Sequence, residues 1–256
     1  MAGQFSQGVI FDLDGVLIDS EGLYYRAYSA VLKPYGVTVS REEYEEHWIA
    51  QGTGPEYIVA KYNLPIAPDE LRQLRSPIYI QLMETEVTLM PYVEETLVQL
   101  SAQFALTVAT NTNREQLDFV LRRMGIDRFF PVTVARQDYR GAKPQPDAFL
   151  TAARKLELPP EHCVVIEDTY RGVVAAVNAG IRCIAVPNEY TLHNDFRQAS
   201  LVLPSLRELT AEKIRGLLSG KSKVKGQKSK MRNFMFSLLI LRSTFNLPLA
   251  FSRRPR

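Results

Sequence analysis

Apolar runs and helical patterns alternate along the chain after residue 100. Near-continuous apolar runs, typical of strands covered on both faces, predict strands at 104–109, 132–135, 164–166, 183–186 and 201–203. Apolar residues at helical spacing predict helices over 114–124, 146–156 and 173–179. Because strands separated by helices pair in parallel through helical crossovers, this pattern predicts an α/β fold with a doubly wound, Rossmann-like parallel sheet.

Residues 8–11 form an apolar run typical of a first buried strand. The stretch from 20 to 89 differs from the rest of the chain, because it has helical patterns and little strand character. Apolar spacing is helical over 23–31 and over 69–86. We therefore expect an all-α cap domain inserted after the first strand. The expected boundaries are a sheet domain of 1–19 and 90–220, a cap of 20–89, and joints near 18–21 and 89–92. Two joints into one sheet would make a hinge for a lid.

Composition is ordinary for a globular protein of 256 residues, with 46% hydrophobic and 23% charged residues. Charge is distributed unevenly, however. Residues 221–256 hold ten of the 31 basic residues and none of the 28 acidic ones, which leaves 1–220 with a net charge of −7. An acidic body does not suggest a nucleic-acid surface, so we expect no nucleic-acid partner.

The basic segment 221–256 is expected to be a poorly ordered tail without a part in the chemistry. The alternative is a basic amphipathic segment that lies on an anionic surface. Its apolar run 234–241 is far shorter than the ~20 residues that span a bilayer, so we expect no stable membrane insertion.

The two cysteines, Cys163 and Cys183, lie in strand-like apolar runs, so we expect buried thiols and neither a disulfide nor a zinc site. The first motif begins by residue 8 and leaves no room for a signal peptide, which favours a cytoplasmic protein. We expect a monomer or a weak homodimer.

Two carboxylates, Asp12 and Asp14, directly follow the first strand, and Gly15 lets the chain bend away after them. Side chains two apart on a strand start on the same side, and ligands of open α/β sheets bind at this end of the strands. Such a pair can hold a hard cation, attack a substrate or protonate it. An ordinary Asp-Gly turn would give the same pattern.

Further polar groups follow the other predicted strands. The hydroxyl of Thr110 and the backbone at Asn111 would make a phosphate or oxyanion cradle, although a helix N-cap is the alternative. Lys143 lies in a segment stiffened by prolines, which favours an aimed side chain. Glu167 and Asp168 add two more carboxylates, and four carboxylates at one edge repel one another unless a cation such as Mg²⁺ lies between them.

These motifs resemble those of the haloacid dehalogenase superfamily, in the branch with a helical cap after the first strand. That branch includes phosphoglycolate phosphatase and β-phosphoglucomutase. The matching motifs span about residues 8–190 and lie at 11–16, 110–111, 143–144 and 167–172.

The resemblance implies a role for each matching residue. Asp12 would take the phosphoryl group as an aspartyl phosphate, and Asp14 would protonate the leaving oxygen and then activate water. Lys143 would neutralise charge and hold the nucleophile. Thr110 and the backbone of Asn111 would bind the phosphoryl group. Mg²⁺ would be held by Asp12, by the backbone carbonyl of Asp14 and by Asp168, with Glu167 in support.

We therefore expect a Mg²⁺-dependent phosphatase acting on a small phosphorylated metabolite, of the sugar phosphate or phosphoglycolate type. Asp14 argues against a dehalogenase, since those members lack it, and the complete motifs argue against a non-catalytic binding module. A phosphomutase stays open. Mutases resembling this chain carry a histidine and an arginine where Tyr24 and Pro55 stand, and no arginine between Arg41 and Arg72 would clamp a second phosphate.

Substrate specificity is expected to lie in the cap. The candidate lining residues are Tyr24, Tyr25, His47, Trp48 and Gln51. For Trp48, and for Tyr28, a place in the interior of the cap is the more frequent alternative.

Overall fold

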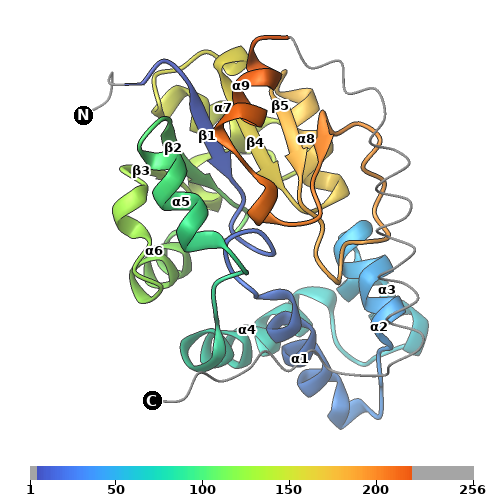
Figure 1. Cartoon of the computed structure of the whole chain (residues 1–256). Helices are drawn as coiled ribbons and strands as arrows, with labels where there is room; N and C mark the ends of the chain where they lie inside the picture. Colours follow the sequence, from blue (N-terminus) through green and yellow to red (C-terminus); the bar gives the residue numbers. More distant parts are fainter. Residues whose placement is uncertain (1–4, 221–256) are drawn as a thin grey trace, which may run out of the picture. The chain divides into compact units, whose positions relative to one another are not determined.

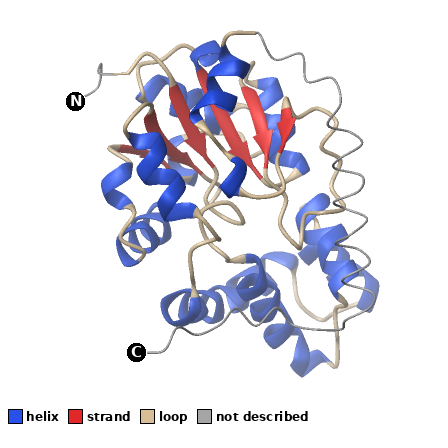
Figure 2. Ribbon diagram, viewed as in Figure 1, coloured by secondary structure: helices blue, strands red, loops and turns tan. Residues whose placement is uncertain are grey.

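Six parallel strands form the centre of the part of the chain that this computed structural model describes, residues 5–220 (Figures 1 and 2). The strands are β1 (Gly8–Phe11), β2 (Ala105–Ala109), β3 (Val132–Val134), β4 (Cys163–Glu167), β5 (Arg182–Ala185) and β6 (Leu201–Val202). Their order in the sheet is β3-β2-β1-β4-β5-β6, and every neighbouring pair is parallel. The order reverses direction at β1, so the doubly wound α/β fold predicted from the sequence is confirmed.

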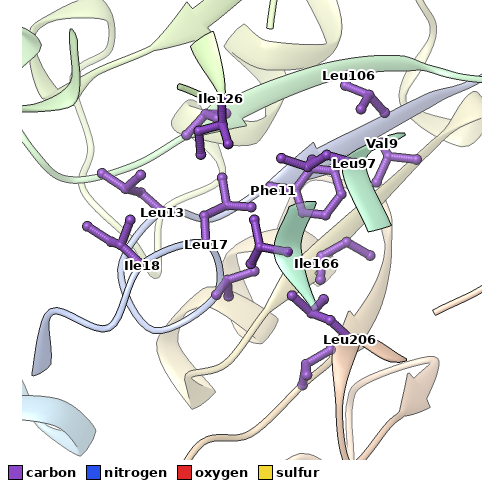
Figure 3. Packing of buried hydrophobic residues seen from close by; sticks show 14 of the residues in the cluster. Val9, Phe11, Leu13, Leu17, Ile18, Leu97, Leu106, Ile126, Ile166 and Leu206 are labelled. Carbon is purple, nitrogen blue, oxygen red and sulfur yellow. The ribbon is translucent and has the colours of Figure 1, made fainter. Parts of the chain in front are cut away.

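Helices cover both faces of the sheet (Figure 2). They are α5 (Val93–Ser101), α6 (Arg114–Arg123), α7 (Asp147–Lys155), α8 (Tyr170–Asn178) and α9 (Ala211–Leu218). Alternate residues of β1 point to opposite faces, as the strand period requires. Val9 and Phe11 pack with residues of α5, α6 and α9, as Figure 3 shows for Leu97 of α5, whereas Ile10 packs with residues of α7 and α8.

Short 3-10 helices connect several of these elements. They are η3 (Asp127–Phe129), η4 (Arg136–Asp138), η5 (Pro160–His162) and η6 (Leu206–Glu208). Residue 104 marks a small difference from the predicted strand 104–109. The backbone N–H of Phe104 donates to the carbonyl of Leu100 at 2.9 Å, so this residue closes the end of α5 and β2 starts one residue later.

Only helices are found between β1 and α5 among the described elements. They are α1 (Glu21–Leu32), η1 (Lys33–Tyr35), α2 (Arg41–Tyr44), the π-helix η2 (Glu45–Ala50), α3 (Gly54–Tyr62) and α4 (Pro68–Glu86). These helices, called the helical insert below, enclose an apolar cluster of their own that includes Tyr28, Tyr44, Trp48, Ile58 and Leu71. Tyr28 and Trp48 therefore do belong to the interior of the insert.

The two connections between the insert and the sheet run side by side. Ile18 and Leu89 form an antiparallel bridge. The N–H of Asp19 donates to the carbonyl of Thr88 at 2.9 Å, and the N–H of Met90 donates to the carbonyl of Leu17 at 3.0 Å. Both connections thus pass through one short hydrogen-bonded ribbon.

Both cysteines, Cys163 and Cys183, are buried and free, as the sequence predicts. Within residues 5–220 no helix is both long enough and apolar enough to cross a membrane. The predicted tail, 221–256, lies outside the described residues.

Candidate active site

The four sequence motifs converge at the carboxyl edge of the sheet. Phe11 pairs with Val108 of β2 and with Ile166 of β4, so the residues that follow these strands leave the sheet side by side. A cavity of about 420 Å³ opens at this edge. Its lining includes these predicted site residues: Asp12, Asp14, Thr110, Asn111, Lys143, Glu167 and Tyr24. The remaining one, Asp168, has a carboxylate oxygen within 4.8 Å of those of Asp12 and Glu167.

Lys143 joins two of the carboxylates. Its Nζ donates to Oδ1 of Asp12 and, at 2.9 Å, to Oε1 of Glu167. Only 4% of Lys143 is exposed, and a buried ammonium requires such partners. Burial lowers the pKa of Lys143, but the two carboxylates outweigh burial and hold the pKa above its ordinary value. The lysine is therefore charged and aimed at Asp12.

Glu167 is fixed through both of its carboxylate oxygens. Oε1 accepts from Lys143, whereas Oε2 accepts from the backbone N–H groups of Asp168 and Thr169, each at 2.8 Å, and from the Thr169 hydroxyl at 2.9 Å. The same Thr169 hydroxyl accepts from the N–H of Gly172 at 3.1 Å and so caps α8. The start of α8 thereby sets the position of the acid that orients Lys143.

Asp168 has an unsatisfied oxygen. Its Oδ2 accepts from Nδ2 of Asn188 at 2.7 Å, but its buried Oδ1 has no hydrogen-bond partner among the described residues. Burial raises the pKa of Asp168 well above its ordinary value, and the nearby Glu167 and Asp12 raise it further. Burial also raises the pKa of Asp12, which Lys143 offsets only in part. An unpartnered oxygen within a buried carboxylate cluster fits a hard divalent cation, because such ions prefer oxygen ligands and remove the repulsion.

Asp14 is held by hydroxyl groups. Its Oδ1 accepts from Ser20 Oγ at 2.7 Å, and its Oδ2 accepts from Thr112 Oγ1 at 2.7 Å and from Thr110 Oγ1 at 3.4 Å. Ser20 and Thr112 were not among the residues predicted from the sequence. Ser20 lies in the predicted joint at 18–21, and Thr112 directly follows the motif at 110–111, so their positions could have pointed to them. That both hydroxyls contact the same carboxylate is visible only in the folded chain.

The loop after β2 is braced by Tyr139. Its hydroxyl lies 2.8 Å from the carbonyl oxygen of Thr110 and 2.7 Å from Oδ1 of Asn111. Helix α6 is capped by Asn113, whose Oδ1 accepts from the N–H of Gln116 at 2.9 Å. The N-cap interpretation of Thr110 is therefore wrong, and its side chain faces the carboxylate cluster.

The opposite wall of the cavity comes from the helical insert. The insert residues that line it are Ser20, Glu21, Tyr24, Tyr44, Trp48, Ile49, Arg75, Ser76 and Tyr79. Of the predicted lining residues, Tyr24 and Trp48 are found there. Glu21 and Arg75 lie there as well and were missed.

Three predicted lining residues do not reach the cavity. The hydroxyl of Tyr25 donates to the carbonyl of Val39 at 2.7 Å. The ring of His47 stacks on Tyr57 with centroids 3.4 Å apart. Gln51 Nε2 donates to Glu46 at 2.6 Å. In each case the side chain is occupied by contacts inside the insert, so these predictions are wrong.

Arg75 extends from α4 to the tyrosines of the cavity. Its Nη2 donates to the hydroxyl of Tyr24 at 3.0 Å, and its guanidinium lies 4.3 Å from the Tyr24 ring centroid. Its buried Nε has no hydrogen-bond partner, and no carboxylate pairs with it among residues 5–220. Arg75 thus lies on the cavity wall three residues beyond the segment from Arg41 to Arg72, which contains no arginine between its ends.

The comparisons with known proteins agree with this geometry. The family model described as haloacid dehalogenase-like hydrolase matches residues 9–186. Protein CbbY of Cereibacter sphaeroides is 32% identical over 79% of this chain and 94% of its own length. A probable pseudouridine-5'-phosphatase of Drosophila melanogaster is 32% identical over 79% of this chain and 91% of its own length.

Among solved structures, a mutant CbbY from Rhodobacter sphaeroides in complex with xylulose-(1,5)bisphosphate superposes with a TM-score of 0.68 at 29% identity. It covers 80% of this chain and 96% of its own. The motifs, the sheet order and these matches place the protein in the haloacid dehalogenase-like hydrolase family, to which it belongs.

Proposed function

We propose that this hydrolase is a Mg²⁺-dependent phosphatase that releases phosphate from a small phosphorylated metabolite through an aspartyl phosphate on Asp12. The observation that carries the proposal is the buried contact of Lys143 with both Asp12 and Glu167. A phosphoryl group brings negative charge to this edge, and a fixed cation there stabilises the charge that develops on its oxygens. The relatives named as phosphatases support the class of phosphoric monoester hydrolase.

Asp12 and Asp168 would hold Mg²⁺, together with the backbone carbonyl of Asp14, and Glu167 would support the site through its bond to Lys143. The unpartnered Oδ1 of Asp168 is the observation in favour of this fit. When bound, Mg²⁺ supplies positive charge that screens the phosphoryl oxygens from the carboxylates.

The reaction then needs two displacements at phosphorus. In the first, a carboxylate oxygen of Asp12 forms a bond to phosphorus while the bond to the leaving oxygen breaks, and the carboxyl proton of Asp14 passes to that oxygen. In the second, water attacks the same phosphorus, its proton returns to Asp14, and the Asp12 carboxylate is released. Ser20 and Thr112 keep the carboxyl of Asp14 in place for both transfers.

The phosphoryl group would be bound by Thr110, the backbone of Asn111 and Lys143. Tyr139 braces that loop from behind, which holds the donors in position before substrate arrives. Residues 20–89 would act as a cap over a sheet domain formed by 1–19 and 90–220, with the ribbon at Ile18 and Leu89 as its hinge.

The proposal is tested by measuring phosphate release from a panel of phosphorylated metabolites and from p-nitrophenyl phosphate with Mg²⁺. Asp12→Asn should abolish release while the circular dichroism spectrum stays that of wild type, and EDTA should abolish wild-type release until Mg²⁺ is restored. Full activity of Asp12→Asn would contradict the nucleophile, and activity undiminished by EDTA would contradict the metal.

A phosphomutase of the β-phosphoglucomutase type is the second candidate. Arg75 favours it, since a guanidinium without a carboxylate partner in the cavity is what the second phosphate of a bisphosphate intermediate would need. Incubation with β-glucose 1-phosphate and a trace of the bisphosphate separates the two. A phosphatase yields free phosphate, whereas a mutase yields glucose 6-phosphate without phosphate release.

A further inference from the structure

Glu21 is a carboxyl group in the cavity that the proposed chemistry does not use. It is the first residue of α1 and follows Ser20, which holds Asp14. The hydroxyl of Tyr44 donates to its Oε2 at 2.9 Å. Tyr44 is only 1% exposed and stacks on Trp48 with ring centroids 5.5 Å apart, so this donor is fixed. The side chain of Glu21 is therefore held in one place on the wall opposite the catalytic edge.

Glu21 has no cationic partner in the described part of the chain. No lysine, arginine or histidine pairs with it among residues 5–220, and its Oε1 has no hydrogen bond there. Burial raises its pKa to about 7, and the carboxylates of Asp14 and Asp19 contribute in the same direction. A mostly buried carboxyl without a counter-charge costs stability, and such groups concentrate where a ligand uses them.

Glu21 presents one acceptor to the cavity. Its Oε2 accepts from Tyr44, whereas its Oε1 accepts no hydrogen bond among residues 5–220. The indole Nε1 of Trp48 and the Nε of Arg75 also lack partners among these residues, but both atoms are buried and shielded from solvent, so they are not available to a ligand. A hydroxyl group matches the Oε1 of Glu21, because it donates a hydrogen bond through its proton.

We propose that Glu21 binds a hydroxyl group of the leaving group, so that the substrates are phosphorylated sugars or polyols rather than phosphorylated acids without hydroxyls. The proposal rests on the phosphatase function and deepens it, since it concerns the part of the substrate that departs. The negative charge of Glu21 would repel a leaving group that ends in a bare carboxylate. Such a leaving group also has no proton to donate to Oε1 of Glu21. 2-Phosphoglycolate is such a compound.

The test compares kcat/KM for two sets of phosphate esters with Mg²⁺. Ribose 5-phosphate, glucose 6-phosphate and glycerol 3-phosphate carry hydroxyls, whereas 2-phosphoglycolate and ethyl phosphate carry none. The enzymes are wild type, Glu21→Ala, the nearly isosteric Glu21→Gln, and Glu70→Gln as a matched control, because Glu70 is exposed on α4 outside the cavity. Thermal melting of each variant verifies that it is folded.

Wild type should favour the hydroxylated set. Glu21→Ala should lower kcat/KM for the best hydroxylated ester by about 10- to 100-fold relative to ethyl phosphate, as expected for a lost hydrogen bond to a charged group. Glu21→Gln, which keeps an acceptor oxygen, should lose less, and Glu70→Gln should match wild type.

Two results would overturn the proposal. One is a wild-type preference for 2-phosphoglycolate or ethyl phosphate. The other is an equal loss on both sets in folded Glu21→Ala, which would make Glu21 a general support of the site. Absence of phosphate release from every ester would instead remove the phosphatase function and this proposal with it, and the two kinds of failure are thus distinguishable.

Discussion

Lys143 decides the charge balance of the site at the scale of single residues. It compensates Asp12 and Glu167 together, whereas one oxygen of Asp168 has no hydrogen-bond partner within residues 5–220. Glu167 in turn has no free oxygen, since both accept hydrogen bonds. The four carboxylates of the motifs therefore differ in role, although the sequence presents them as two similar pairs. In the proposed mechanism Asp12 and Asp14 take part in the reaction and Asp12 and Asp168 would hold the cation, whereas Glu167 holds Lys143.

Glu21→Gln should change stability in a pH-dependent way. The pKa of Glu21 lies near 7 in the folded chain against an ordinary 4.5, so the folded state binds this proton more tightly. The wild type consequently loses stability as pH rises through this window. Glutamine has no proton to lose, so the variant should be more stable than wild type at pH 8 by at most about 3 kcal/mol, a bound that water in the open cavity lowers.

Urea unfolding in EDTA at pH 4 and pH 8 measures this effect. The difference between Glu21→Gln and wild type should be close to zero at pH 4 and favour the variant at pH 8. The same difference at both pH values would show that burial does not perturb Glu21, and Glu70→Gln serves as the exposed control.

The turn from β4 into α8 is the element on which the site depends most. Glu167 ends the strand, Asp168 faces the cluster, Thr169 caps the helix, and Gly172 lies one turn further. A Cβ at Gly172 would overlap the carboxylate of Glu167. Only a glycine at this position leaves room for the carboxylate of Glu167 against the helix. The requirement for glycine comes from this close packing and not from an unusual backbone conformation.

Gly172→Ala should therefore lower both stability and activity. The added methyl group displaces Glu167 and strains a tightly packed turn, which should lower the free energy of unfolding by about 1–3 kcal/mol. The same displacement moves the partner of Lys143 and should lower activity. Urea unfolding and p-nitrophenyl phosphate turnover measure the two effects. Val177→Ala on the exposed side of α8 should leave both close to wild type. A fully active Gly172→Ala would contradict the role given to Glu167.

For the whole molecule, the sheet and the meeting of the motif residues at its carboxyl edge could be predicted because both follow from local patterns. Apolar runs followed by polar residues mark strand ends, and parallel pairing brings those ends together, as it does for Asp12 and Asp168. The opposite wall could not be predicted. Whether Glu21, Tyr25 or Arg75 reaches the cavity depends on how α1 and α4 pack, and helical spacing alone leaves that rotation open.

Removal of residues 222–256 should leave phosphate release unchanged. The residues that line the cavity, together with Asp168, lie between 12 and 171, and the strands that carry the motifs lie within residues 5–220. Steady-state rates of phosphate release, measured for the shortened and the full-length chains under the same conditions, test this prediction. An inactive shortened protein would show that the basic segment belongs to the catalytic unit.

Intact mass spectrometry of Asp14→Asn after mixing with p-nitrophenyl phosphate and Mg²⁺ tests whether Asp12 carries the phosphoryl group, as proposed. The nitrophenolate departs without a proton, so the first displacement proceeds in this variant, whereas the second lacks its base and stalls. The protein should gain the mass of one phosphoryl group, located by peptide mapping at Asp12. Turnover without any such mass gain, or a phosphoryl group on another residue, would contradict the account.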